Sequence, residues 1–480
     1  MPICSALVII ATLYGFVRKT KLKEMHNYFL LMYTVLLLYW PQGYFVALGN
    51  YKLSNVVTFS ELILFIVSLF ILVRIKVCSR LLFLGCVFFL LILIGSLYEY
   101  LNPVNFQIIN DYADWDYYAY GRIGKETINI NIKEQIILYI QVINYIINVF
   151  IVKTIYSKDD IYNLLQKIVL WSAFVIGTGI LEFTIKNIIH YQDVYYMIKG
   201  IFFGISEKTV IEPVVRGSFY SLEGMTTEPS HYTCTIFISL MLAAILKKIN
   251  AMKTEVAQKS SLLNFMTKKT YFIIGLITMY LTGGFSGILY IVMAIIGYSI
   301  ISSGHYEKLY LRLKKYLIYS IVSVLACWVI LYVLYNYGEG YVKYRMDISV
   351  SVIEMLISGN YYLFGVVDSS VPRFIANMDV FLDFMKRPLL GLGIGVQTAF
   401  NEFSTMFSYF GILGVAAWLL FINQIGKNNY DILKLHYDKI FLVFIFFIAG
   451  FFAGETHMML PMINVLYFLL YESTKLYSYK

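Results

Sequence analysis

The chain has 480 residues, of which 59% are hydrophobic and only 14% charged, and its formal net charge is +9. Soluble domains carry about 25% charged residues, so this composition excludes a cytosolic globular enzyme, a nucleic-acid-binding protein and a disordered tail. We expect an all-α polytopic integral membrane protein in which residues 1–480 form a single transmembrane domain.

A helix needs about 20 mostly apolar residues to cross a bilayer. In chain order, the stretches that approach this requirement are 3–17, 27–49, 56–73, 81–98, 135–153, 161–184, 230–246, 270–283, 286–303, 317–336, 402–425, 440–452 and 459–471. The first stretch is followed, not preceded, by basic residues, so we expect a retained helix and no cleaved signal. Two closely spaced pairs, 270–303 and 440–471, are each open to misassignment, and we therefore expect about 12–13 transmembrane helices.

The linkers between these spans alternate in charge. Lys and Arg concentrate, 24 of 38 against only 8 of the 29 acidic residues, in 18–26, 74–80, 153–160, 247–269, 304–316, 426–439 and the C-terminal tail. An excess of Lys and Arg marks the inner side of a membrane protein. We therefore expect three long segments, 99–134, 185–229 and 337–401, to be extracytoplasmic loops that carry short helices.

The second outer segment leads into a span through the sequence RGSFYSLEGMTTEPSHYT, which begins at Arg216. Arg216 is either an ordinary surface arginine or an anion ligand, because its planar fork of N–H donors suits a phosphate. The sequence EPS is typical of a helix start, and a helix N-terminus presents free N–H groups to an anion. This segment is therefore a candidate anion site.

The third outer segment contains a predicted amphipathic helix from Arg373 to Arg387. Its apolar stripe, at helical spacing, consists of Phe374, Met378, Phe381 and Met385. A helix of this kind lies on the membrane surface. Pro388 ends it, and the glycines of the following GLGIG allow a sharp turn or close backbone packing.

Weaker signals lie elsewhere. Asp114 and Asp116 form an isolated D-x-D, a pattern that acidic loops also produce by chance. Glu61, Glu182 and Glu402 lie within spans, where acids are functional candidates. We expect Glu182 and Glu402 to reach the interface, and Glu61 to lie nearer the middle third of its helix, still within reach of the outer surface. Cysteines and histidines show no metal-ligand spacing, so we expect neither a metal nor another cofactor.

The order of these motifs resembles a known family over roughly residues 210–425. An arginine precedes EPS, a TGGFSG turn follows, and a second arginine precedes RPLLGLGIG and FNEFSTMFSYFGILG. This resembles the O-antigen polymerase and ligase superfamily, in particular the Wzy-type polymerases of O-antigen and capsular polysaccharide.

The resemblance implies a GT-C-like glycosyltransferase of the bacterial plasma membrane whose active site faces the periplasm or the cell exterior. Its substrates would be glycan repeat units on undecaprenyl pyrophosphate, held in membrane lipid, and a chain-length regulator and a flippase would be its partners. By position, Arg216 and Arg373 match the outer-loop arginines that engage pyrophosphate. The nearest outer acids are Glu223, Glu228 and Asp368, and any general base is left open among them.

Tyr220, His231, Arg387 and Asn401 complete the predicted substrate-binding residues. In the ligase branch a histidine precedes the position of Asn401, whereas this chain has Phe400. That difference favours a polymerase over a ligase. A lipid-linked oligosaccharide flippase is a further alternative, although flippases usually lack long outer loops. A generic transporter is expected to show broken helices or charges at mid-membrane.

Overall fold

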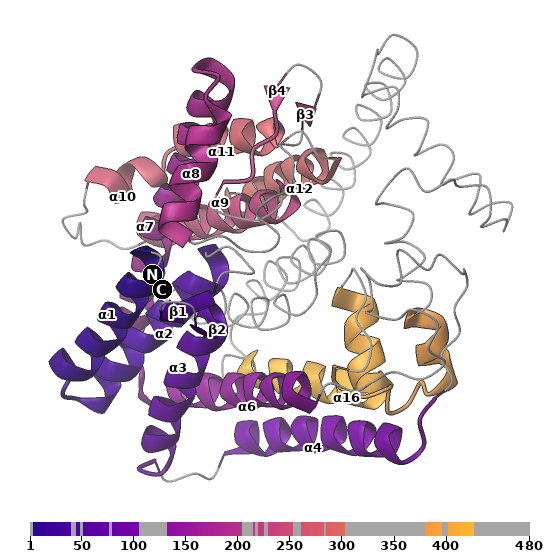
Figure 1. Ribbon diagram of the computed structural model, residues 1–480. Coiled ribbons are helices and arrows are strands. Elements are labelled where there is room, and N and C mark those ends of the chain that lie inside the picture. Colours follow the sequence, from indigo (N-terminus) through magenta and orange to yellow (C-terminus); the bar gives the residue numbers. More distant parts are fainter. Residues whose placement is uncertain are drawn as a thin grey trace, which may run out of the picture.

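The computed structural model describes residues 3–39, 45–48, 51–75, 79–104, 132–203, 215–216, 219–224, 229–252, 261–282, 285–302, 380–395 and 402–426. These residues form a bundle of packed helices with two short hairpins (Figure 1). Over residues 3–101 the described elements are α1 (Ile3–Arg18), α2 (Leu22–Tyr39), β1 (Phe45–Leu48), β2 (Tyr51–Asn55), α3 (Val56–Leu72) and α4 (Arg80–Leu101).

The remaining elements include those that form the site described below. They are α6 (Ile132–Ile155), α7 (Lys158–Phe183), the π-helical turn η1 (Thr184–Ile188), α8 (Gln192–Phe203), β3 (Val215–Arg216), β4 (Phe219–Tyr220), α9 (Pro229–Met252), α10 (Ser261–Met266), α11 (Lys269–Leu281), α12 (Phe285–Ser302) and α16 (Glu402–Gly426). Residues 380–386 form one further short helix.

Ten of the thirteen predicted spans fall on described residues, and each contains a helix. The expected span 27–49 was wrong in its second half, because α2 ends at Tyr39 and residues 45–48 pair with β2 as an antiparallel strand. A proline at position 41 explains the early stop, since the residue before a proline is pushed out of the helical region. The spans 317–336, 440–452 and 459–471 lie outside the described residues.

Among the residues that the structure describes, four helices are long and apolar enough to cross a membrane: Arg80–Leu101, Gln135–Ile155, Asp159–Ile188 and Ser404–Phe421. Shorter apolar helices occupy Ile3–Arg18, Val56–Leu72, Tyr232–Lys247 and Lys269–Leu281. The fold is therefore that of a helical membrane protein, while the total of 12–13 spans and the GT-C-like arrangement stay predictions.

Apolar side chains both fill the bundle and cover its surface. Helix α9 is buried along most of its length, with Phe237, Met241 and Leu246 fully enclosed. By contrast, Val17 on α1 and Phe83 on α4 are 75% and 66% exposed. Exposed apolar residues on peripheral helices suit contact with lipid, because lipid tails solvate them as well as a protein core does.

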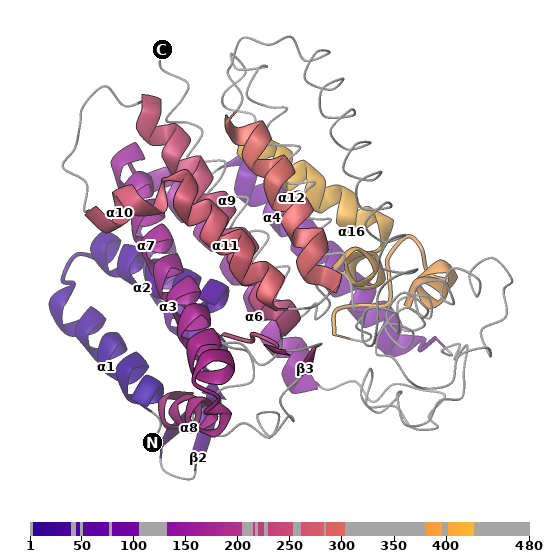
Figure 2. The ribbon, with the colours of Figure 1, turned by 90° about the horizontal axis from the view of Figure 1, so that it is seen from above.

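The helices pack most extensively in three pairs: α4 with α16, α2 with α3, and α9 with α12. Figure 2 shows α7, α9, α11 and α12 as one group of inclined helices, with α4 and α16 beside each other at its flank. The chain thus brings α4 into contact with a helix that follows it by about 300 residues.

Contacts at the helix ends join segments predicted to share a side of the membrane. Two of the predicted outer segments meet where Arg387 binds Glu99. Gln135, the first residue of the predicted span 135–153, donates to the Ile394 carbonyl of the third outer segment. On the predicted inner side, the Lys153 ammonium donates to the Gln424 carbonyl. These contacts agree with the alternation of the linkers, and which side faces outward stays a prediction.

Candidate functional site

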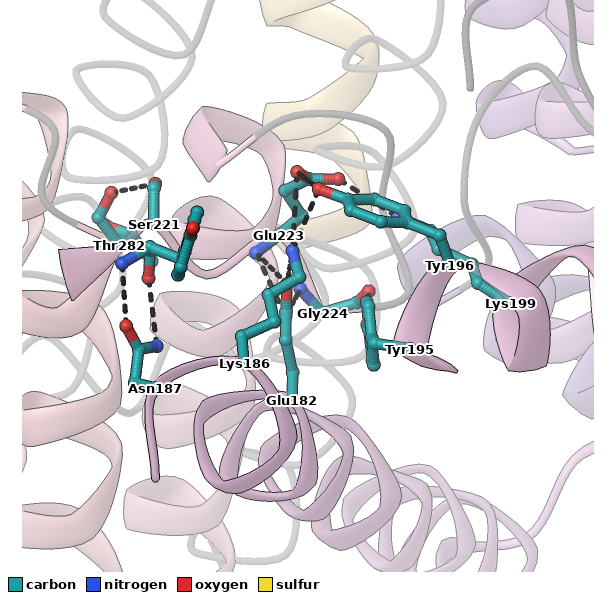
Figure 3. A network of polar contacts seen from close by, with 11 residues as sticks. Glu182, Lys186, Asn187, Tyr195, Tyr196, Lys199, Ser221, Glu223, Gly224 and Thr282 are labelled. Atoms are coloured by element: carbon teal, nitrogen blue, oxygen red, sulfur yellow. Dashed lines mark hydrogen bonds and ion pairs between the residues drawn. The ribbon is translucent and has the colours of Figure 1, made fainter. Parts of the chain in front are cut away.

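A buried polar cluster lies where α7 ends, and Figure 3 shows it from close by. Its side chains come from α7 and η1, from α8, from the segment 219–224 and from the end of α11. They belong to Glu182, Lys186, Asn187, Tyr195, Tyr196, Lys199, Ser221, Glu223 and Thr282. The cluster therefore joins the second predicted outer segment to the ends of α7 and α11.

The π-helical turn η1 extends α7 and sets the spacing of the cluster. Helix α7 starts with a capping box, in which Ser157 and Asp160 bind each other's backbone N–H groups. At its other end the turn changes to π geometry over Thr184–Ile188. Such turns are frequent at functional sites. Here the turn carries Lys186 and Asn187, which contact the segment 219–224.

Glu182 holds the backbone of that segment. Its carboxylate accepts the N–H of Gly224 at 2.6 Å and the N–H of Glu223 at 3.1 Å. Gly224 has a φ of +56°, and a Cβ there would lie 2.2 Å from the Tyr232 ring. Glycine is therefore required at this turn, because any side chain would meet both backbone strain and the ring.

Two carboxylates and two ammonium groups neutralise one another inside the cluster. Lys186 lies 2.6 Å from Glu182 and 3.7 Å from Glu223, and Lys199 lies 3.1 Å from Glu223. All four side chains are at most 9% exposed. Burial of ions is tolerated only when they are paired and hydrogen-bonded, so the cluster depends on all four charges.

Two tyrosines of α8 complete the surroundings of Lys186. Its ammonium lies 4.4 Å from the centre of the Tyr196 ring and 4.8 Å from that of Tyr195, within cation–π range. Burial and the Glu223 carboxylate raise the pKa of Tyr196 to about 12, although Lys186 opposes the rise. The Tyr196 phenol therefore stays protonated at neutral pH, and its O–H donates a hydrogen bond to the Glu223 carboxylate.

The hairpin β3–β4 is anchored beside these charges. The Asn187 amide accepts the N–H of Tyr220 at 2.6 Å and donates to its carbonyl at 3.2 Å. The Ser221 hydroxyl donates to the Thr282 carbonyl at 2.6 Å. Since Arg216 of β3 pairs in register with β4, its backbone is tied to the end of α7.

A second segment of irregular chain, residues 388–395, passes between α4 and α16 and is held there by specific contacts. The Leu392 N–H donates to the Ser408 carbonyl at 2.6 Å, and the Ile412 N–H donates to the Pro388 carbonyl at 2.8 Å. Helix α16 is broken at Gly411, whose φ is 61°. The passing chain thus supplies the backbone partners that the broken helix lacks.

Glycines make this passage possible. Gly391, Gly393 and Gly395 have φ values of 73°, 90° and 72°. A Cβ on Gly391 would lie 2.5 Å from the Ser408 carbonyl oxygen, and one on Gly393 would lie 2.7 Å from the Cα of Ser96. The prediction that these glycines serve close packing and sharp turns is confirmed.

Arg387 has protein partners at the start of this passage. Its guanidinium donates to Glu99 at 2.6 Å and to the Asn102 carbonyl, and it lies 4.6 Å from the centre of the Tyr98 ring. Glu99 is only 2% exposed. Arg387 therefore joins the end of α4 to the chain ahead of Pro388, and its predicted contact with substrate stays a prediction.

The other predicted site residues divide into two groups. Glu223 is buried in the cluster, Tyr220 is half-buried on β4, Arg216 lies on β3, and His231 lies in the first turn of α9. Three residues lie outside the described part of the chain: Arg373, Glu228 and Asn401. The described residues therefore bring together four of the eight candidates around one end of α7 and α9.

Sequence reasoning named Glu182 among the candidate acids within spans but missed its place in the cluster. We expected Glu182 to reach the interface, whereas it is fully buried and paired with Lys186. The available signal was spacing, because a Lys four residues after a Glu lies on the same helix face. Among the described residues, no group of three or more His, Cys, Asp or Glu side chains could hold a metal ion; Asp114 and Asp116 are not part of them.

Long apolar helices and apolar side chains exposed on peripheral helices define the class of this chain as a helical membrane protein. Compared with models of protein families, with curated proteins and with solved structures, the chain matches none.

Proposed function

We propose that this chain is a membrane glycosyltransferase, a polysaccharide polymerase that transfers an undecaprenyl-pyrophosphate-linked glycan onto another lipid-linked repeat unit. The observation that carries the proposal is the anchoring of the Arg216 hairpin. Asn187 holds the backbone of Tyr220, and Glu182 holds that of Glu223 and Gly224. A rigid arginine-bearing hairpin at the end of apolar helices suits a substrate with a lipid tail and an anionic head.

The reaction needs such rigidity because charge develops on the leaving group. The bond between the anomeric carbon and the pyrophosphate breaks, and a bond from that carbon to the acceptor oxygen forms. Negative charge grows on the departing pyrophosphate, and preorganised donors stabilise it at little reorganisation cost. In the proposal, Arg216 and Arg373 supply these donors, and no metal is required.

Glu223 takes a different role in this proposal from the one we first expected. Both of its oxygens have partners, namely Lys199, Lys186 and the Tyr196 phenol. A carboxylate held in this way is poorly disposed to remove a proton from an acceptor hydroxyl. We therefore assign Glu223 to positioning the hairpin, and Glu228 and Asp368 are the remaining candidate bases.

A flippase for lipid-linked glycans is the second candidate, and the break of α16 at Gly411 favours it. Broken helices in transporters offer their exposed half-helix ends to substrates. Here the N–H groups of Ile412 and Leu413, at the start of the second half, donate to the Pro388 and Leu389 carbonyls. That end is therefore not open to an anion, and we rank the transferase first.

The experiment uses purified protein in lipid vesicles with lipid-linked repeat units, and measures polymer length and released undecaprenyl pyrophosphate. Loss of one charge-assisted contact costs roughly 3 kcal/mol, about a hundredfold in rate. We expect Arg216→Ala and Arg373→Ala to lose that much, and Arg→Lys to lose part of it, because lysine lacks the planar fork.

Arg122→Ala is the matched control, since Arg122 lies in a predicted outer segment but outside the resemblance. Normal polymerisation by both Arg216→Ala and Arg373→Ala would contradict the proposal. Movement of the lipid-linked unit across the bilayer without polymer formation would favour the flippase. Long polymer that accumulates on the carrier in a deletion strain, with none attached to its acceptor, would favour the ligase.

A further inference from the structure

A second polar system, separate from the hairpin cluster, lies inside α2, α3 and α6. It begins at an ion pair between Lys23 and Asp160, 2.6 Å apart, whose side chains are 43% and 26% exposed. The Lys23 ammonium lies 5.9 Å from the centre of the Tyr156 ring. Both residues of the ion pair belong to segments predicted on the inner side, so this polar system starts at a solvent-exposed end of the helices.

The next members lie deeper in the bundle, from the half-buried Tyr156 to the buried His26 and Asn148. His26 is 0% exposed, and its Nδ1 lies 2.7 Å from the Tyr156 hydroxyl while its Nε2 lies 2.8 Å from the side-chain Oδ1 of Asn148. The Asn148 NH₂ group donates to the backbone and side-chain oxygens of Asn144. Because that amide presents oxygen to His26, Nε2 carries the proton and Nδ1 accepts from Tyr156.

Glu61 lies at the deep end of this line. It is 2% exposed, and its Oε1 accepts a hydrogen bond from Tyr33 at 3.3 Å. The amides of Gln141 and Asn144 lie beside the carboxyl group. Its second oxygen, Oε2, is buried without a hydrogen-bond partner. Among the described residues, no cation pairs with Glu61.

A carboxylate in these surroundings requires a positive ion. An isolated buried carboxylate is so unfavourable that it takes up a proton or binds a cation instead. The described side chains that face it are one phenol and two amides, all neutral. An acid within a membrane span is by default a functional candidate. The alternative is that these polar groups serve only to hydrogen-bond the helices to one another.

We propose that Glu61 is a proton-exchange site within the membrane, reached from the Lys23 end of the bundle past Tyr156, His26, Asn148 and Asn144, with water carrying the proton beside the two amides, because a carboxamide does not relay one. The ligand is the proton, and a monovalent metal ion is the competing occupant of the same oxygens. Loading and unloading change the charge by one unit at the contact between α2, α3 and α6. The proposal does not depend on the transferase.

The experiment is infrared difference spectroscopy on the whole protein in lipid vesicles, with steps of pH and with exchange of H₂O for D₂O. A protonated carboxyl has a C=O band that ionisation removes and that deuterium shifts. We expect such a band in the wild type, its complete loss in Glu61→Gln, and its retention in Glu61→Asp. Thermal melting of each variant shows whether it is folded.

The access path has its own matched pair of variants. Asn148→Leu interrupts the line between His26 and Glu61, and we expect deuterium to reach the carboxyl several-fold more slowly. Thr34→Val is the control, because Thr34 is equally buried on α2 but bonds its own helix at Leu30. We expect its exchange rate to equal that of the wild type.

Three results would overturn the proposal. The first is a spectrum of folded Glu61→Gln that equals that of the wild type, which means that Glu61 holds no exchangeable proton. The second is loss of the band on addition of Na⁺ at constant pH, which assigns the site to a metal cation. The third is unchanged exchange in Asn148→Leu, which removes the path.

Discussion

The segments 219–224 and 388–395 are held in place by different interactions. Each holds an irregular chain against the ends of apolar helices. Segment 219–224 is fixed by charge, through Glu182 and its partner Lys186. Segment 388–395 is fixed by backbone contact, through glycines that pass within van der Waals distance of α4 and α16.

The difference shows what each region tolerates. A buried ion pair fails when one partner is removed, because the other charge is left unpaired. A glycine passage contains no charge to lose, and it fails when any side chain is added. The first region should therefore be sensitive to the loss of a charged side chain, and the second to the addition of a side chain at a glycine.

The largest effect should come from Glu182→Leu. It leaves Lys186 buried without its nearest carboxylate and removes the acceptor of two backbone N–H groups. We expect a loss of about 3–5 kcal/mol in the free energy of unfolding, measured by thermal melting and SDS titration. The control is Glu24→Gln, which breaks an exposed pair with Lys21 and should cost about 0.5 kcal/mol or less. Equal costs for the two variants would refute a charge-fixed segment.

A slightly smaller effect should follow Gly411→Ala in the second region. Its φ is 61°, and a Cβ would lie 2.3 Å from the Leu389 carbonyl oxygen. Left-handed strain and overpacking together should cost about 3 kcal/mol in the same melting experiment. Gly177→Ala is matched to it, because no atom lies within 4 Å of a Cβ there; it should be neutral or stabilising. A stable Gly411→Ala protein would argue against the passage.

Asn187→Ala tests the anchoring of the hairpin independently of the buried charges. It removes two hydrogen bonds to the backbone of Tyr220 and leaves Glu182 intact. At about 1 kcal/mol for each bond, we expect a loss of about 2 kcal/mol and faster hydrogen exchange at the Tyr220 amide. Thr267→Ala, which removes an exposed bond within its own turn, should leave both quantities unchanged. Unchanged exchange in Asn187→Ala would mean that other contacts suffice to hold β4.

The smallest effect is a dependence on alkaline pH. The pKa of Tyr196 is about 12 in the folded chain, against an ordinary value of 10.0. Because the unfolded chain loses this proton first, the contribution of Tyr196 to the free energy of unfolding is fully present below pH 10 and is lost as the pH rises towards 12. Tyr196→Phe should flatten that fall in melting midpoints measured across this range. An equally steep fall in Tyr196→Phe would show that other groups cause it.

Much of the fold was predictable from the sequence because its signals are local. Apolar length predicted the helices from Ile3–Arg18 to Glu402–Gly426, and the stop of α2 at Tyr39 departed from prediction near a proline. The glycines after Pro388 also carried a local signal, since left-handed backbone angles favour glycine wherever they occur. These properties belong to a residue and its neighbours in the chain.

The candidate site was predictable only in part. The hairpin region around Arg216 and Tyr220 was selected from its motif, and Glu223 was selected as an outer acid. Its role changed when Lys199, 24 residues earlier, proved to be its partner. No spacing rule predicts such a pair, because the two residues lie on separate elements.

Composition and hydrophobic length by themselves determined that this chain is a helical membrane protein, since transfer into lipid depends on each segment's own side chains. Tertiary structure alone decided which charges are neutralised. Glu223 meets Lys199, Arg387 meets Glu99, and Glu61 meets no cation among the described residues. The physical reason is that the energy of a buried charge depends on the atoms around it, which the folded chain collects from distant positions.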